Sequence, residues 1–71
     1  MWQTYTPDGR VIAIRKTESG WLATCLANRV ESASAEQAIR EAIGEPLEGT
    51  REELDRWIVE HAVDLEAAAA E

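Results

Sequence analysis

Few side chains of this 71-residue chain could take part in catalysis or metal binding. They are one histidine, His61, one cysteine, Cys25, and many carboxylates in the second half of the chain. A Cys–His pair can supply a nucleophile and its base. Here it would require a strand residue to meet a helix residue, and no oxyanion donor is evident. We therefore interpret His61 as a core or boundary residue and Cys25 as a small buried strand residue. The sequence predicts no catalytic residue, and we expect a protein that is not an enzyme.

Metal and cofactor sites are also not predicted. Glu60 and Asp64 lie one helical turn apart, but hard metal ions need several convergent oxygen ligands, and this spacing is common on solvated helices. One thiol cannot form a multi-thiolate zinc site or an intrachain disulfide. The isolated glycines do not form a phosphate-binding loop. We expect no bound metal and no cofactor.

The first 30 residues have the character of strands. Val11–Ile14 is β-branched, and Trp21–Leu26 is a second run of similar length. Thr17–Gly20 has the composition of a hairpin loop, in which its glycine can take positive φ. Pro7–Gly9 is another turn, which would connect a first strand at Trp2–Thr6 to the next one. The prediction is a three-stranded antiparallel meander.

The second half predicts two helices. Ser34–Gln37 has the pattern of a capping box, and the helix should cover residues 35–43, with Pro46 preventing its continuation. Thr50–Glu53 is a second capping box, which begins a helix over about 51–68. The whole chain then forms one α+β domain, residues 1–71, in which two helices pack on one face of the meander in the order β-β-β-α-α.

The second helix is not simply amphipathic. Its predicted core face consists of Leu54, Trp57, Ile58, His61 and Leu65. On a helical wheel Val59 and Val63 point to the opposite side. Three readings follow: the helix is covered on two sides, the valines form an apolar strip that contacts a partner, or they are ordinary surface residues. If the valines form a contact strip, the partner is another protein or a second copy of the chain.

Charge is distributed unevenly along the sequence. The net charge is −7; residues 1–30 carry four basic and two acidic side chains, and residues 31–71 carry three basic and twelve acidic ones. A field of this sign attracts basic surfaces and opposes nucleic acid and anionic lipid. We therefore expect no direct binding to nucleic acid or membrane. The N-terminus lacks a basic segment leading into an apolar run, and a single cysteine is typical of reducing compartments, so we expect a cytoplasmic protein.

The acidic side chains of the second helix fall into two groups. Glu53, Glu60 and Asp64 share one flank, and Asp55 and Glu66 share the other. Glu60 and Asp64 stand about 6 Å apart along the axis, and Glu53 stands about 10 Å from Glu60. These intervals are comparable to small multiples of the phosphate rise along one DNA strand, about 3.4 Å. Around the inter-helix turn the acidic surface would be extended by Glu41, Glu45 and Glu48. The alternative reading is a solvated helix face without a partner.

One local pattern resembles HicB-type antitoxins. It consists of Gly20–Ala23, a strand that opens with glycine and an aromatic residue, followed by Glu31–Ile39, a turn, a serine cap and an acid-alanine helix. The resemblance covers about twenty residues and implies an antitoxin that neutralises a small toxin ribonuclease. The proline-containing segment usual between the two pieces is missing from residues 24–30.

In overall type, a very short, strongly acidic α+β chain without catalytic residues resembles the phage-encoded anti-CRISPR proteins, many of which occupy nucleic-acid-binding surfaces of CRISPR effector complexes. The resemblance implies an inhibitor that acts as a DNA mimic. We hypothesise that Glu53, Glu60 and Asp64 contact lysine or arginine on a basic protein or ribonucleoprotein complex, with apolar anchorage from Val59 and Val63. The HicB-like antitoxin and a homo-oligomeric structural module remain as alternatives.

Overall fold

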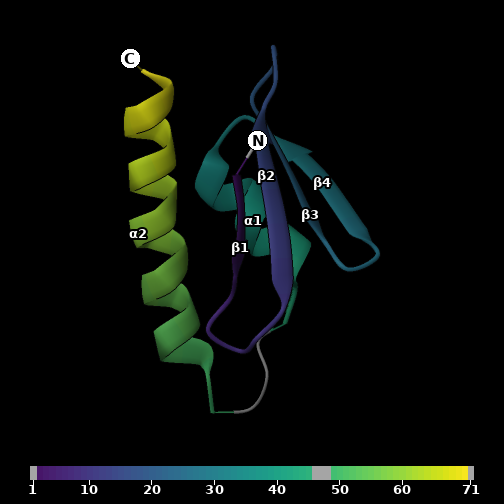
Figure 1. Ribbon diagram of the computed structural model, residues 1–71, viewed down its shortest axis with the longest axis vertical. Helices are drawn as coiled ribbons and strands as arrows, with labels where there is room; N and C mark the ends of the chain where they lie inside the picture. The colour runs from purple at the N-terminus through teal and green to yellow at the C-terminus, as the bar shows by residue number, and fades with distance from the viewer. Residues whose placement is uncertain (1, 46–48, 71) are drawn as a thin grey trace.

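The computed structural model describes residues 2–45 and 49–70 as an antiparallel sheet followed by two helices (Figure 1). The elements are β1 Trp2–Tyr5, β2 Val11–Lys16, β3 Trp21–Cys25, β4 Asn28–Ser32, α1 Ala35–Ile43 and α2 Arg51–Ala69. Sheet order follows chain order, β1-β2-β3-β4, so every strand pairs with its neighbour in sequence. The α+β class is confirmed. Within the described ranges neither helix is long and apolar enough to cross a membrane.

The number of strands corrects the sequence prediction, because the sheet has four strands and not three. The additional strand, β4, pairs with β3 through the register Ala23↔Val30 and lies at the sheet edge. Its sequence, NRVES, contains only one β-branched residue, and that residue, Val30, is only partly buried. An edge strand that buries so little side chain lacks the apolar run used to recognise strands. The loop before it, Leu26-Ala27, also lacks the usual turn residues.

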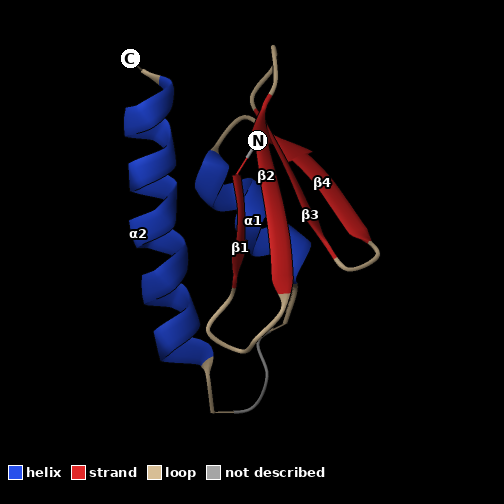
Figure 2. Cartoon of the chain, in the orientation of Figure 1, coloured by secondary structure: helices blue, strands red, loops and turns tan. Residues whose placement is uncertain are grey.

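Both helices share one hydrophobic core with the same face of the sheet. In Figure 2, α1 lies behind the strands and α2 lies beside them. Strand side chains alternate between the two faces. Those pointing to the helices are buried: Ile12, Ile14, Trp21, Ala23 and Cys25. Their neighbours in sequence are half-buried or exposed on the opposite face. The sheet therefore has one covered and one open face, as is common for antiparallel sheets.

Alanines set the position of α1 against the sheet. Ala35, Ala38 and Ala42 are completely buried, together with Ile39. Because alanine adds little bulk, the backbone of α1 lies close to β3 and β4. The longer helix α2 packs on α1 through Leu54, Ile58, Ala62 and Leu65. In Figure 1, α2 runs along one side of the molecule while α1 lies behind the strands.

The carboxyl end of α1 is held by the turn between β1 and β2. Arg10 Nη1 donates to the Ile43 carbonyl at 2.9 Å, a contact between residues 33 apart in the chain. The same guanidinium binds Asp8 through Nη2 at 2.5 Å and Nε at 3.1 Å. Thr6 completes the turn, since its hydroxyl donates to Asp8 and accepts from the Arg10 amide. The Asp8 side chain is only 1% exposed, so this ion pair is well shielded from water.

Two further side chains bind the ends of α1. Asn28 Nδ2 donates to the Ala42 carbonyl at 3.1 Å, next to the carbonyl that Arg10 binds. At the other end the Ala35 amide donates to Glu66 Oε1, on the last turns of α2, at 3.2 Å. These bonds occupy backbone groups that a helix leaves without an internal partner. They tie α1 to β4 and α2.

The two predicted capping boxes form only in part. Ser34 Oγ accepts from the Gln37 amide at 3.2 Å, as expected for the first box. The Gln37 side chain, however, turns along the helix and donates to Glu41. Thr50 is the N-cap residue of α2, but its side chain does not accept the capping hydrogen bond. Its ψ of 1° departs from the extended geometry that brings a side-chain oxygen to the N2 or N3 amide.

Asp8→Asn should reduce stability in a pH-dependent manner. The Arg10 guanidinium lowers the pKa of Asp8 from 3.8 to about 2. A carboxylate with a depressed pKa stabilises the fold above its unfolded pKa, and this contribution disappears as the pH falls through 2. The shift corresponds to about 2 kcal/mol. In urea titrations at several pH values, the stability difference between wild type and D8N should be about 2 kcal/mol at pH 6 and close to zero at pH 2. A difference that does not change with pH would contradict this role.

Gly20→Ala should prevent stable folding. Gly20 has a φ of 154°, and a Cβ added there would lie 2.1 Å from the Ser32 carbonyl oxygen, which is backbone of β4. Because the clash is with backbone, β4 must move, at a cost of at least about 3 kcal/mol. Circular dichroism should show loss of the cooperative transition. Gly9→Ala is the matched control: its Cβ would meet nothing within 4 Å, so only the strain of its positive φ should remain.

Candidate functional site

The flank of α2 that faces α1 uses its acidic side chains inside the molecule. Asp55 Oδ1 accepts from Arg40 Nη1 at 2.7 Å, and this ion pair joins the two helices. Glu66, three turns further along α2, binds the amide of Ala35. The pair Asp55 and Glu66, which the sequence placed on one flank, therefore consists of structural residues. Binding of either carboxylate to a partner would require the loss of its contact within the fold.

The other flank of α2 carries Glu53, Glu60 and Asp64, and all three are exposed. Within the described residues, none of them takes part in an ion pair. They lie at about 240° to 280° around the helix when Leu54 is set at 0°, so they share one surface. The structure thus brings these three predicted residues together on a rigid helix that is 19 residues long. We call Glu53, Glu60 and Asp64 the acidic flank.

The remaining predicted acidic residues do not extend this flank. Glu41 accepts a hydrogen bond from Gln37 and lies on the side of α1 turned away from α2, since Arg40 faces α2 and the next residue is 100° further round. Glu45 lies in a hollow between the end of α1 and the start of α2, together with Arg40 and Arg51. Glu48 lies outside the described residues.

The two valines identified in the sequence lie between the flanks of α2. Val59 is 43% exposed and Val63 is 61% exposed. No described element covers them, so the helix is not buried on two sides. They form a short apolar strip beside the acidic flank.

The histidine lies within α2, and the cysteine lies in the hydrophobic core, within electrostatic range of the Asp8–Arg10 ion pair. His61 Nδ1 is 2.9 Å from the Trp57 carbonyl oxygen, a hydrogen bond within α2, and its ring lies 4.2 Å from the Trp57 ring. Cys25 is 1% exposed at the end of β3, and burial raises the pKa of its thiol, which disfavours the reactive thiolate. Among the described residues no three His, Cys, Asp or Glu side chains are grouped so that they could hold a metal ion.

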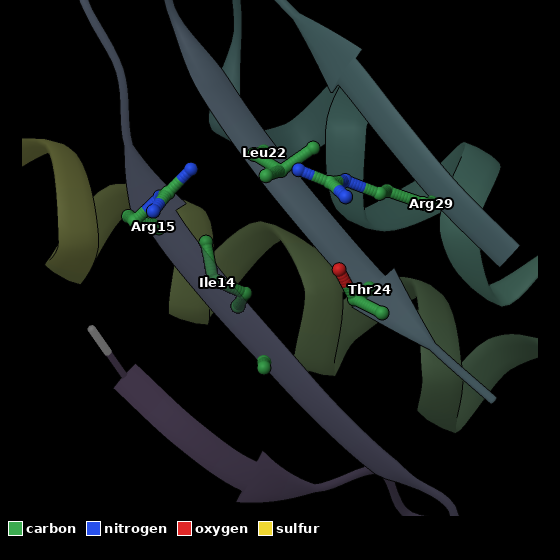
Figure 3. A pocket seen from close by; sticks show the side chains of 6 residues that line it. Ile14, Arg15, Leu22, Thr24 and Arg29 are labelled. Carbon is green, nitrogen blue, oxygen red and sulfur yellow. The ribbon is translucent and has the colours of Figure 1, made fainter. Parts of the chain in front are cut away.

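The open face of the sheet is a surface that sequence analysis missed. It contains a shallow depression of about 230 Å³ over β2, β3 and β4. Figure 3 shows Leu22 and Thr24 on β3, with Arg15 on β2 and Arg29 on β4 on either side of them. The sequence predicted this face in part, because the strand at Trp21–Cys25 must alternate between core residues and residues on the opposite face. What was missing was β4, which brings Arg29 to this face.

Replacing both valines of the apolar strip by serine should leave the isolated protein as stable as the wild type. Val59 and Val63 make no core contact, and serine and valine have similar helix propensities, so we expect a change within about 0.5 kcal/mol in the free energy of unfolding. Chemical denaturation measures it. As a matched control, Ile58→Ser on the buried side should cost at least about 3 kcal/mol. A large loss in the valine variant would show that the strip is covered in the folded protein.

Comparisons with known proteins give no match. The chain matches no known protein-family model, and no curated protein or solved structure is significantly similar to it. These comparisons neither support nor oppose the resemblances to HicB-type antitoxins and anti-CRISPR proteins. The function must be inferred from the chemistry of the protein's own surfaces.

Proposed function

We propose that this protein is a non-enzymatic inhibitor, similar in type to anti-CRISPR proteins. It docks through the acidic flank of α2 on a basic, nucleic-acid-binding surface of another protein or ribonucleoprotein complex, and it excludes the DNA or RNA that would bind there. The observation that carries this proposal is the difference between the two flanks of α2. The acids facing α1 are bonded within the molecule, whereas Glu53, Glu60 and Asp64 are exposed and have no ion pair among the described residues.

Exposed carboxylates favour a cationic target for an energetic reason. Each one can form charge-assisted hydrogen bonds with lysine or arginine without first breaking an internal ion pair. The helix holds the three side chains in fixed relative positions, so little backbone entropy is lost when a partner binds. Carboxylates at intervals of about 6 and 10 Å along the axis can engage arginines and lysines that normally contact successive phosphates.

The apolar strip supplies a second type of contact. Charge complementarity increases the rate of encounter, but it does not by itself give a long-lived complex. Val59 and Val63 lie next to the acidic flank and are exposed, so both can be buried when the flank docks. A binding surface with apolar residues beside charged ones matches the usual arrangement of protein interfaces.

Charge reversal of the acidic flank tests the proposal directly. The variant E53K/E60K/D64K should lose at least about 100-fold in affinity for its partner, because each contact becomes a repulsion. The partner is first captured from a lysate of the native host on immobilised wild-type and variant protein in parallel. Displacement of a fluorescent oligonucleotide from the captured complex then measures inhibition, at 50 and 300 mM salt.

The control variant E18K/E36K/E41K changes the net charge by the same amount at exposed positions away from the acidic flank. It removes the exposed Glu36–Arg40 ion pair, which contributes little to stability. It should inhibit nearly as well as the wild type. If both variants lose inhibition equally, net charge and not the flank is responsible. If the flank variant, shown to be folded by circular dichroism, still displaces the oligonucleotide, the proposal is wrong. A small basic toxin as the captured partner would instead favour the antitoxin alternative.

A further inference from the structure

The open face of the sheet exposes more apolar surface than a solvated face requires. Three of the large apolar side chains that are most exposed lie at one end of the sheet: Tyr5 is 68% exposed, Val11 41% and Leu26 74%. Tyr5 pairs with Val11, and the pairing of Ile12 with Cys25 brings Leu26 to the same level of the sheet. The depression beside Leu22 continues this apolar area toward the other end.

Leu26 is also held in an unfavourable backbone conformation. It has a φ of 55° and is the only non-glycine residue with positive φ in the described part of the chain. It occupies the first position of the two-residue loop between Cys25 and Asn28, where glycine or asparagine is usual. A β-carbon there costs about 1 kcal/mol or more. No contact within the monomer compensates for this strain, because the Leu26 side chain is exposed.

The charges on this face are arranged symmetrically about β3. Arg15 of β2 pairs with Leu22 of β3, and Leu22 pairs with Glu31 of β4, so the three residues form one row across the sheet. Leu22 stands in the centre, one strand spacing, about 4.8 Å, from each charged neighbour. A two-fold axis parallel to β3 and above Leu22 exchanges the two sides of the row. It brings Leu22 of each copy together and places Arg15 of one copy opposite Glu31 of the other.

We propose that the protein forms a symmetric homodimer in which the open faces of two sheets pack together, with two Arg15–Glu31 ion pairs across the interface on either side of a central Leu22 contact. The axis parallel to the strands gives the aligned packing in which sheets lie about 10 Å apart at a small angle. Leu26, in the loop that follows β3, lies near the same axis and can contact its copy. The arrangement is self-complementary, as a two-fold interface requires.

The size of the face sets the expected strength. A two-fold axis above β3 overlaps β2, β3 and β4 of each copy and leaves β1 at the rim. Three strands about 4.8 Å apart and five residues long give a footprint of about 14 by 16 Å per copy. The total area buried by two copies is therefore below about 1,000 Å², in the range of weak and transient interfaces. We therefore expect a dimer with a dissociation constant in the micromolar range, which populates at high protein concentration.

A nucleic acid is the competing occupant of this face, because Arg15 and Arg29 both lie beside the depression (Figure 3). The second copy is favoured for two reasons. Glu31 lies in the same row as Arg15 and would repel a phosphate placed there. The chain as a whole carries a net charge of −7, which opposes the approach of a polyanion. The dimer uses the sheet and leaves α2 on the outside of each copy. The dimer proposal therefore does not depend on the function proposed for the acidic flank of α2.

Complementary charge variants test the dimer in solution. Sedimentation equilibrium over 5 to 500 µM should show a monomer–dimer equilibrium for the wild type. R15E and E31R should each raise the dissociation constant at least about tenfold, because both cross-interface pairs become like-charge contacts. The double variant R15E/E31R should return to within about threefold of wild type. An equimolar mixture of R15E and E31R should also dimerise, since the mixed pair places opposite charges at both crossings.

The mixture provides the decisive control, because it contains only the two single variants. If the mixture dimerises, the loss of association in each variant alone was not caused by misfolding. R56E, which changes the same charge on α2, should leave the dimer unchanged. L26G should weaken the dimer while the monomer stays folded.

The proposal is overturned if the wild type is monomeric at all concentrations, or if neither the double variant nor the mixture restores association. Retained dimerisation in the single variants, with loss in V59S/V63S, would place the contact on α2. Loss of association only after nuclease treatment would identify a nucleic acid as the occupant.

Discussion

The contact on which the rest of the molecule depends is the one between Arg10 and the carboxyl end of α1. A helix of nine residues is too short to be stable by itself, and its terminal carbonyls have no partners within the helix. The Arg10 guanidinium binds the Ile43 carbonyl and is fixed in turn by the buried carboxylate of Asp8. This charge-assisted arrangement replaces the water that would otherwise solvate the helix end. It also holds the carboxyl end of α1 beside the β1–β2 turn, while the buried alanines set its distance from the sheet.

Once α1 is fixed, the orientation of α2 follows. The Arg40–Asp55 ion pair and the hydrogen bond from the Ala35 amide to Glu66 lie near opposite ends of the contact between the helices. They determine which side of α2 faces inward, and core residues such as Ile58 fill the space between. The acids on the other side are then directed outward by helical geometry alone. The internal use of one acidic flank and the exposure of the other are thus two results of a single packing arrangement.

The two proposed surfaces lie on different parts of the fold and have different chemistry. The acidic flank of α2 offers carboxylates to a cationic partner, and its binding should weaken as salt increases. The open face of the sheet offers a row in which Leu22 lies between one positive and one negative residue, which suits a second copy. A dimer through the sheet would present two acidic flanks at once. A target with repeated basic sites would then be bound with an increased effective affinity.

The sequence by itself determined the α+β class, both helices, the glycine turns and the separation of the α2 acids into two flanks, because each of these follows from local periodicity or from the conformational preferences of a few residues. Only the tertiary structure decided the rest. β4 has too little apolar pattern to be recognised, since an edge strand is stabilised by backbone pairing with β3. The roles of Arg10 and Glu66 were equally hidden, because both bind backbone groups more than 30 residues away. The structural or free state of each carboxylate depends on which arginine or amide the fold brings to it, and no local pattern records that.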